Sequence, residues 1–456
     1  MKLSSLIVSL ISVAGISLLA AESESKMPSL TKDLLEGEIW TKSLAEIKAA
    51  YDPEEGEEEE EMEIPEEIRK QLEEQGVNIG EGGGGGARFS WLSLKKEGLR
   101  APGETFTLLA KEIGEVVLRE DEKGVKAITV SLYNRGDDGE LNVRDYHSRL
   151  EEWKTLLDEK LEVRPQSRDD RGVVATTGWM WRKDDIAYLV EGSVSKSPKR
   201  AEFIRLRIAP LKGFGATTKK ASRTEVKRNV VTKDNGDVFI EGIPMVDQGD
   251  KGYCVVASIE RVARYFGLKV DQHELAQLAD TTAEEGTDAE DMEKAFKKIT
   301  GKIHIRTNRV MDYDYDQTVK DVKAYDREAK KREVKVFDIN FDTHYVIAQG
   351  FWEKADKETF KVVKAKQTGY KLFNSKIEQY VDRGIPLCWT LYMGMFPKKG
   401  TPQSWGGHMR IIHGYNEETS EIMYTDSWGE GHAMKRMPAI EAWCMTTGVY
   451  AMIPLN

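Results

Sequence analysis

The stretch between residues 54 and 86 constrains the fold of this chain more than any other, because it cannot bury apolar surface. Ten glutamates lie within residues 54–67, and five consecutive glycines occupy residues 82–86. Like charges repel one another and a glycine run leaves the backbone free, so this part favours a solvated conformation. A phosphate-binding loop would need a Lys-Ser/Thr pair after the glycines, and none follows. We therefore predict that residues 22–88 are acidic, glycine-rich and largely flexible.

The first residues of the chain have the pattern of an export signal. Lys2 is followed by an apolar run, then by the small residues Ala20 and Ala21, and then by polar sequence. Serines interrupt the run, which argues against the alternative of an uncleaved membrane anchor. No later segment is long and apolar enough to span a bilayer. Residues 1–21 are therefore predicted to be a cleaved signal peptide, and the mature protein is expected to be secreted or periplasmic.

Length and composition predict two folded units with ordinary hydrophobic cores. The 456 residues exceed what a single core usually organises. The formal net charge of -11 argues against nucleic-acid binding, which needs a basic surface to neutralise phosphates. Three cysteines do not make a disulfide framework in an exported chain, so stability must come from packed apolar side chains. We expect Cys388 and Cys444, which lie in apolar sequence, to be core thiols.

Residues 89–212 have the pattern of a small α+β domain. Residues 126–134, 185–194 and 202–211 are rich in strand-forming side chains, and the last of these runs alternates apolar with charged residues. Another run carries apolar residues at the spacing of a helix, at Tyr146, Leu150, Trp153, Leu157 and Leu161. No cluster of His, Cys and carboxylate residues accompanies these elements. The sequence therefore assigns no chemistry to this domain.

A basic stretch separates this domain from the rest of the chain. Seven basic residues and a single acidic one lie between Lys212 and Lys233, among small and polar residues. We interpret residues 213–236 as an inter-domain linker. Residues 237–456 are then expected to form a second unit of mixed helix and strand, which contains every residue of catalytic interest. The sequence leaves open whether residues 22–236 inhibit this unit, target it or bind a partner.

Cys254 lies where a polar, glycine-containing loop turns into a helix. The apolar residues after it recur at helical spacing and predict a helix that begins close to the cysteine, with a stripe formed by Val255, Ile259, Val262 and Phe266. A helix N-terminus and a neighbouring imidazolium both lower the pKa of a cysteine thiol, and the thiolate is the nucleophilic form. Gln248 precedes Cys254 by six residues, so its amide N–H can point toward an oxyanion formed near the sulfur.

Of the seven histidines, His408 is the one for which the sequence predicts a carboxylate partner. The runs "HMRIIHGY" and "EIMYTDSW" are strand-like and are joined by a polar turn. If they pair as a hairpin, Tyr415 lies opposite about Glu421 and His408 falls near Asp426, whereas His413 faces an apolar residue. A carboxylate beside His408 would fix its tautomer and stabilise its charged form.

Each of these features alone has a simpler structural explanation. A cysteine at a helix start is usually a packed residue, and a strand histidine usually packs or faces solvent. It is their joint occurrence that favours nucleophilic catalysis. His344 and His413 are isolated in strand-like runs, and no metal-ligand spacing appears. We therefore predict neither a metal nor a cofactor.

Three segments resemble the active-site motifs of papain-like cysteine peptidases. "QGDKGYC" is similar to their nucleophile loop, "GGHMRIIHGY" to their catalytic-histidine strand, and "DSWGEGH" to their Asn-Ser-Trp-Gly segment. By this resemblance Gln248 would supply the oxyanion hole and Cys254 the nucleophile. His408 would be the general base, Asp426 the residue that orients it, and Trp428 the aromatic cover of the His–carboxylate bond.

The resemblance also has departures, and they indicate a branch of the clan. Asp426 replaces the usual Asn, as in the bacteriocin-processing double-glycine peptidases and other bacterial branches. Tyr253 and Val255 replace the usual residues beside the cysteine, and the disulfide cysteines of papain are missing. The resemblance covers only residues 237 onward. It implies an α+β fold, with the cysteine on an N-terminal helix and the His and Asp on a C-terminal antiparallel sheet.

Together these features predict an exported cysteine peptidase that hydrolyses peptide bonds through Cys254, His408 and Asp426, with Gln248 in the oxyanion hole. The expected partner is a protein or peptide substrate, with no nucleic acid and no stable membrane span after signal cleavage. Two other functions remain open. One is a transglutaminase-like acyl transferase that uses the same triad. The other is a peptidase-like binding or scaffold protein without catalysis.

Overall fold

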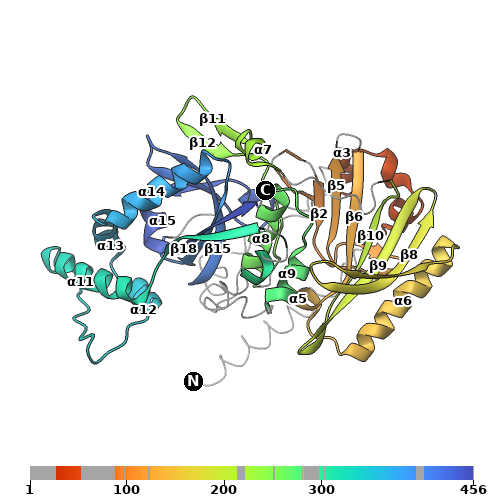
Figure 1. Ribbon diagram of the computed structural model, residues 1–456, viewed down its shortest axis with the longest axis horizontal. Coiled ribbons are helices and arrows are strands. Elements are labelled where there is room, and N and C mark those ends of the chain that lie inside the picture. The colour runs from red at the N-terminus through yellow and green to blue at the C-terminus, as the bar shows by residue number, and fades with distance from the viewer. Residues whose placement is uncertain are drawn as a thin grey trace, which may run out of the picture.

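The structure is a computed structural model, and it describes residues 27–52, 88–93, 95–96, 98–121, 124–212, 221–249, 252–279, 281, 297–300, 303, 305–396 and 405–454. The predicted signal peptide, the glutamate block and the glycine run lie outside these residues. The described chain forms two units that lie side by side, each built around its own antiparallel sheet of eight strands (Figure 1). The expected α+β fold is confirmed.

The N-terminal unit is a twisted antiparallel sheet covered on one face by a long helix. The strand order is β1-β2-β5-β6-β10-β9-β8-β7. Helix α6 (Val143–Leu161) packs against β8, β9 and β10 and buries all five apolar residues that the sequence pattern singled out. The strands are β1 (Ser90–Trp91), β2 (Gly98–Ala101), β5 (Val116–Asp121), β6 (Gly124–Asn134), β7 (Gln166–Arg171), β8 (Ala175–Lys183), β9 (Ile186–Lys196) and β10 (Lys199–Pro210), with a separate hairpin of β3 (Thr107–Leu108) and β4 (Lys111–Glu112).

Residues 27–52 belong to this unit, in contrast to the largely flexible region expected from residue 22 onward. They form α2 (Thr31–Leu35), η1 (Glu38–Thr41) and α3 (Leu44–Tyr51), and α3 begins with a capping box formed by Ser43 and Glu46. These short helices bury a set of apolar side chains in the N-terminal core, namely Leu30, Leu34, Leu35, Ile39, Leu44 and Ile47. This segment folds because its own apolar side chains are buried in the core, although the sequence on either side of it is polar.

The C-terminal unit carries the second antiparallel sheet, in the order β11-β12-β15-β14-β18-β13, with β16 paired to β15 and β17 to β16. Its strands are β11 (Val230–Thr232), β12 (Asp237–Ile240), β13 (Ile305–Asp312), β14 (Leu387–Met393), β15 (Gly406–Asn416), β16 (Glu421–Thr425), β17 (Lys435–Pro438) and β18 (Thr446–Pro454). Its helices are α7 (Arg223–Lys227), α8 (Cys254–Tyr265), α9 (Gln272–Ala279), α11 (Tyr315–Lys331), α12 (Ala348–Lys354), α13 (Lys357–Ala365), α14 (Thr368–Val381) and α15 (Ala439–Met445), with the 3-10 turn η2 (Glu430–His432).

Part of the expected linker is folded. Strand β11 pairs with β12, and Val226 of α7 is buried in the core of the C-terminal unit. The second unit therefore begins before residue 237, where the sequence analysis placed its start. Residues 213–220 lie outside the described residues. The short apolar run at β11 was overlooked because the residues around it are basic and polar. It forms a strand because its backbone pairs with that of β12.

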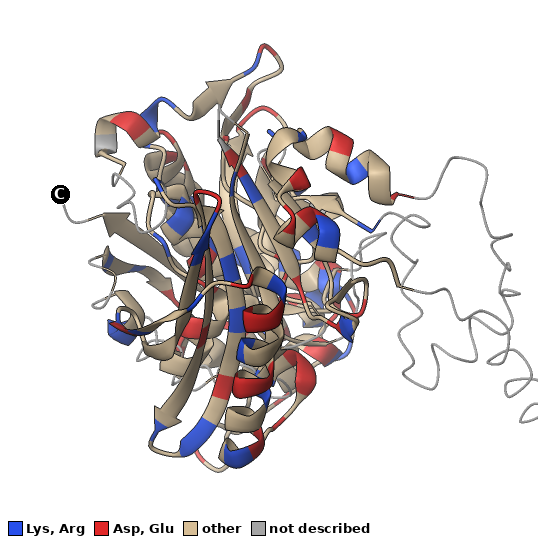
Figure 2. Ribbon diagram, turned by 90° about the vertical axis from the view of Figure 1, so that its right-hand side faces the viewer, with Lys and Arg blue, Asp and Glu red and all other residues tan. Residues whose placement is uncertain are grey.

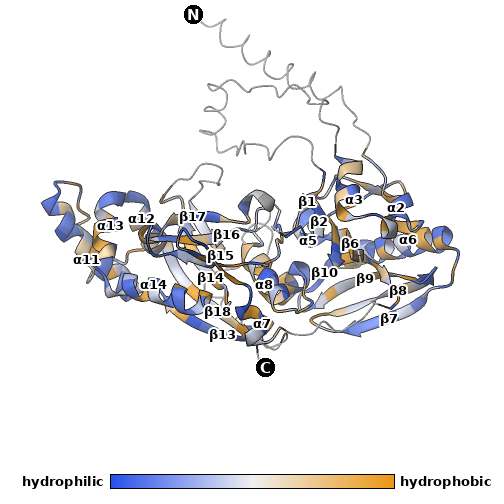
Figure 3. Cartoon of the chain, turned by 90° about the horizontal axis from the view of Figure 1, so that it is seen from above, coloured by the Kyte–Doolittle hydropathy of each residue, from blue (hydrophilic) through white to orange (hydrophobic). Residues whose placement is uncertain are grey.

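Helix α8 lies between the two units, as both Figure 1 and Figure 3 show. It packs against β15 and α9 on its own side. Its apolar stripe is buried as expected, but Glu260 and Arg261 are also buried, with exposures of 2% and 1%. A helix that is buried on its polar face as well needs charged partners there. Arg261 has its partners inside the C-terminal unit, where it donates to the carbonyls of Pro244 and Asp426 and to the Thr425 hydroxyl. Glu260 instead lines a pocket between the two units.

The outer side of the N-terminal unit is charged. Strand β7 is an edge strand whose residues are all exposed, and four of its six residues are charged. Figure 2 shows Lys and Arg interspersed with Asp and Glu over this side. A charged edge discourages pairing with strands of other molecules. Among the described residues, no helix has both the length and the apolar character needed to cross a membrane.

Candidate active site

Cys254 is the first residue of α8, as the apolar periodicity predicted. Tyr253 precedes it outside the helix, with φ -91° and ψ 12°. The first backbone N–H groups of a helix have no partner inside the helix, so Cys254 lies at a site of positive potential. Cys254 is partly exposed, whereas Cys388 and Cys444 are buried. Burial raises the pKa of both buried thiols to about 12.

His408 lies on β15 and joins the cysteine to a carboxylate. Its Nε2 is 2.6 Å from Asp426 Oδ1, and a side-chain hydrogen bond joins it to Cys254. Since Nε2 is engaged by Asp426, the other ring nitrogen, Nδ1, is the one that faces the sulfur. The three residues come from the start of α8, from β15 and from the segment just after β16. The structure thus brings together three of the predicted site residues.

The charges around His408 favour its protonated form. Burial lowers the pKa of His408, but the charges of Asp426 and Cys254 and their hydrogen bonds outweigh this effect and raise the pKa to about 9. Burial alone would raise the pKa of Asp426, yet His408 and Arg410 hold it well below its usual range. Asp426 is therefore an ionised carboxylate at neutral pH, and His408 is an imidazolium.

Trp428 covers the pair formed by His408 and Asp426. Its ring stacks on the His408 ring at 4.4 Å between centroids, with 14° between the planes. The side chain of His408 is 4% exposed and that of Asp426 is fully buried. An aromatic cover excludes water and so strengthens the ion pair beneath it. This is the position that the resemblance implied for Trp428.

Arg410 is a site residue that the sequence analysis missed. Its Nε donates to Asp426 Oδ2 at 2.6 Å, so each carboxylate oxygen of Asp426 accepts from a different cation. An asparagine at position 426 would turn its NH2 group toward the guanidinium, where only an acceptor fits. Arg410 is therefore a physical reason for Asp in place of Asn. The sequence did contain a signal for Arg410. In a strand, residues two apart share a face, so Arg410 is expected on the same face of β15 as His408.

Gln248 is held by Ser427, the residue after Asp426. Ser427 Oγ donates to Gln248 Oε1 at 2.7 Å, and the backbone N–H of Gln248 donates to the Ser427 carbonyl at 2.8 Å. Because Oε1 accepts from Ser427, Nε2 is the end of the amide that can donate elsewhere. The predicted oxyanion donor thus lies beside the segment that carries Asp426. Ser427 belongs to the motif that contains Asp426, but its hydrogen bond to Gln248 was not predicted.

Next to the turn, the hairpin register differs by one residue from the predicted one. Tyr415 pairs with Ile422, not with Glu421, and a bulge interrupts the ladder at His413. Past the bulge the pairing returns to the predicted offset, with Ile411 opposite Thr425, so His408 reaches Asp426 as expected. His413 is buried and its Nδ1 lies 3.1 Å from the Ile240 carbonyl oxygen. Burial lowers the pKa of His413 to about 4, so this histidine is neutral and lies apart from the triad.

The raised pKa of His408 predicts an alkaline limit to activity. The imidazolium, which can protonate a leaving amine, is present below a pKa of about 9 and is lost as the pH rises through that value. We expect kcat/KM to fall about tenfold per pH unit above it, as for loss of one essential proton. In Asp426→Asn the stabilising charge is gone, and the midpoint should move to lower pH. An unchanged alkaline midpoint in this variant would contradict the assignment of the limb to His408.

The C-terminal unit is similar in sequence to known peptidases. Residues 240–451 match the model of the Peptidase_C39 like family. A similar solved structure is the peptidase domain of Streptococcus ComA, a bi-functional ABC transporter involved in a quorum sensing pathway. The match covers 47% of this chain and 100% of that domain, at 13% identity and a TM-score of 0.24. Among curated proteins none matches the chain. The C-terminal unit of this protein is thus similar to the Peptidase_C39 like family.

Proposed function

We propose that this protein is an exported cysteine peptidase that hydrolyses peptide bonds. The observation that carries the proposal is the chain of hydrogen bonds from Cys254 to His408 and from His408 to Asp426. A binding or scaffold protein without catalysis would not require a partly exposed thiol beside a covered imidazolium–carboxylate pair. The match to a peptidase family over residues 240–451 supports the same class of reaction.

The proposed reaction has two acyl-transfer steps. The Cys254 thiolate attacks the carbonyl carbon of a peptide bond, and the electron pair of the C=O bond moves to the oxygen. Gln248 Nε2 and the backbone N–H of Cys254 stabilise this oxyanion. As the oxyanion collapses, the C–N bond breaks and the leaving amine takes the proton of His408, which leaves a thioester on Cys254.

Water then hydrolyses the thioester. Neutral His408 accepts a proton from the water as its oxygen attacks the acyl carbon, and the C–S bond breaks. The products are a carboxylic acid and the regenerated thiolate–imidazolium pair. Asp426 stays ionised throughout and stabilises the imidazolium each time it forms. No metal or cofactor enters either step.

Active-site labelling tests the nucleophile. We expect a peptidyl epoxide, supplied near pH 6, to modify Cys254 alone, because burial raises the pKa of Cys388 and Cys444 to about 12 and keeps them from the reagent. Intact-mass analysis should find one adduct on the wild-type chain and none on Cys254→Ala. Cys388→Ala is the matched control and should label like wild type. Faster labelling of Cys388 or Cys444 than of Cys254 would exclude this site.

Product analysis separates hydrolysis from transfer. Internally quenched peptides incubated with an added primary amine should give carboxylic acid products if water is the acceptor. Amide products in place of acids would indicate a transglutaminase-like enzyme with the same triad.

Export is proposed from residues 1–21 alone. The mass of the chain recovered from its native compartment tests this proposal, since a cleaved signal leaves a shorter chain.

A further inference from the structure

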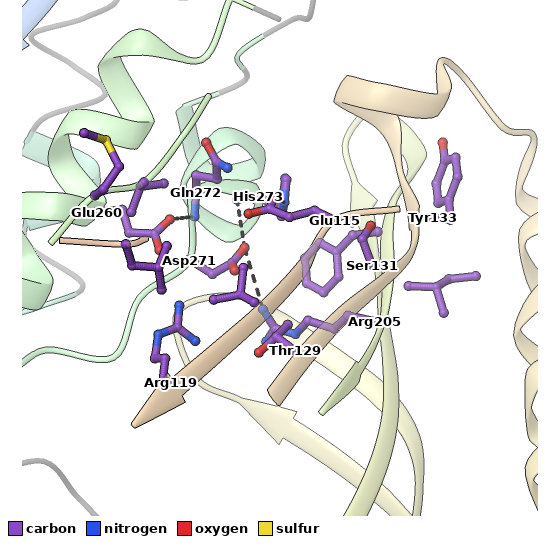
Figure 4. Close-up of a pocket in the computed structure, with 16 residues that line it drawn as sticks. Glu115, Arg119, Thr129, Ser131, Tyr133, Arg205, Glu260, Asp271, Gln272 and His273 are labelled. Carbon is purple, nitrogen blue, oxygen red and sulfur yellow. Dashed lines mark hydrogen bonds and ion pairs between the residues drawn. The ribbon is translucent and has the colours of Figure 1, made fainter. Parts of the chain in front are cut away.

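The two units meet along a charged seam beside the candidate active site. Figure 4 shows side chains of both units around a pocket in this seam. Arg205 of β10 approaches Asp271, which precedes α9, at 3.8 Å, and His273 of α9 approaches Glu115, which precedes β5, at 3.8 Å. Paired charges of this kind fix the relative position of two surfaces more strictly than apolar packing does.

Arg100 of β2 connects this charged seam with the loop that contains Gln248. Its Nε donates to Glu115 at 2.9 Å and its Nη1 donates to Asp247 at 3.0 Å. Arg100 is 6% exposed, so the guanidinium is nearly removed from water. Glu115 belongs to the N-terminal unit, and Asp247 is the residue directly before Gln248 in the C-terminal unit. One buried arginine therefore links the N-terminal sheet to the oxyanion loop.

Asp247 in turn sets the shape of that loop. Its Oδ1 accepts from the backbone N–H of Gly249 at 2.9 Å, and Gly249 has a φ of 68°, in the left-handed region that favours glycine. The Asp247 carbonyl accepts from Gln272 Nε2 at 3.1 Å. The N-terminal unit makes a second contact here, because the Met245 N–H donates to the Leu92 carbonyl. The backbone is thus fixed on both sides of Gln248.

We propose that the N-terminal unit is a built-in positioning partner of the catalytic unit, and that Arg100 acts through Asp247 to hold Gln248 in place for oxyanion binding. This inference rests on the proposed peptidase function. It assigns to the N-terminal unit a supporting role in catalysis rather than an inhibitory one. Arg100 is a positioning residue, since it contacts the support of the oxyanion donor and not the reacting atoms.

Loss of the guanidinium leaves two carboxylates, Glu115 and Asp247, without their shared cation. Removing one partner from a buried charge cluster is costly because the remaining charges lose part of their compensation. The loop that carries Gln248 can relieve this by moving Asp247 toward solvent. Such a movement would shift the Gln248 amide away from the oxyanion while leaving Cys254, His408 and Asp426 in place.

The test compares hydrolysis with simple alkylation in full-length variants. For Arg100→Gln we expect kcat on internally quenched peptides to fall about ten- to hundredfold with little change in KM, less than the loss on deleting an oxyanion donor. The rate of Cys254 alkylation by iodoacetamide, which forms no oxyanion, should stay within about twofold of wild type. Arg100→Lys, which keeps the charge, should recover part of kcat. Asp247→Asn should lower kcat similarly, and the double variant should be no worse than either single one.

Arg205→Gln is the matched control. Arg205 is also buried and also joins the two units, through Glu191 on one side and Glu274 on the other, but it does not contact Asp247. We expect this variant to keep its kcat at a temperature where it is folded. An equal fall of kcat in Arg205→Gln, or a parallel fall of the alkylation rate in Arg100→Gln, would overturn the specific role of Arg100. So would an unchanged kcat in both Arg100→Gln and Asp247→Asn.

A second readout keeps this inference separate from the proposed function. Hydrogen exchange at the amides of Gln248 and Gly249, which donate to Ser427 and Asp247, should quicken in Arg100→Gln and not in Arg205→Gln. If the wild-type chain hydrolysed no peptide, the proposed function would fail, but hydrogen exchange would still test the clamp, that is, the hold of Arg100 on Gln248 through Asp247. If exchange at both amides stayed at the wild-type rate in Arg100→Gln, the clamp would be excluded whatever the activity.

Discussion

His408→Ala is expected to lower kcat for peptide hydrolysis by about 10⁴-fold to 10⁶-fold, the range seen when a triad member is removed. The variant loses the proton donor for the leaving amine and the cation that pairs with the Cys254 thiolate. Because His408 is the bridge between Cys254 and Asp426, its removal breaks the chain of hydrogen bonds at its centre. The residual rate would come from oxyanion binding and substrate binding alone. Steady-state kinetics on internally quenched peptides measure the loss.

His413→Ala is the control for this prediction. His413 lies on the same strand and is equally buried, but it bonds to the Ile240 carbonyl and not to the triad. We expect it to lower thermal stability, because a buried hydrogen bond is lost, and to leave kcat of the folded protein within a fewfold of wild type. Equal losses of kcat in His408→Ala and His413→Ala would contradict the assignment of the base.

Asp426→Ala is expected to lower kcat by about 10³-fold to 10⁴-fold, as removal of the orienting carboxylate does in comparable triads. His408 then has no acceptor for Nε2 and loses most of the charge that stabilises its protonated form. The variant also leaves Arg410 buried without a counter-charge, which costs about 3–5 kcal/mol of stability. Kinetics should therefore be measured well below the unfolding midpoint, with circular dichroism as the check on folding.

Asp426→Asn should lose less activity than Asp426→Ala, because its carbonyl oxygen can still accept from His408. Its NH2 group would face Arg410, and this clash should make the change more costly here than the tolerance of related enzymes for Asn implies. Arg410→Met in the Asn background removes the clash and should raise kcat above that of Asp426→Asn alone. A lower or equal kcat in the double variant would show that Arg410 is not what selects the carboxylate.

The proposed nucleophile and base could be identified from sequence because their signals are local. The apolar spacing after Cys254 predicted the start of α8 at the right residue, since helix periodicity depends only on neighbours within two turns. The two strand-like runs around a polar turn predicted the hairpin that carries His408. Their exact register could not be predicted, because the pairing next to the turn is offset by one residue and a bulge at His413 then removes this offset. Asp426 was still predicted, since it lies past the bulge, where the pairing has the expected offset.

The sequence by itself determined which segments become α8, β15 and β16 and which side chains on them are candidates for catalysis. Only the tertiary structure decided what holds those side chains in place. Arg410 could be paired with Asp426, and Ser427 with Gln248, only once the chain was folded. Arg100 lies 147 residues from Asp247 and carries no pattern that points to it. Ion pairs and hydrogen bonds between distant segments depend on how whole sheets and helices pack, and periodicity along the chain contains no information about that.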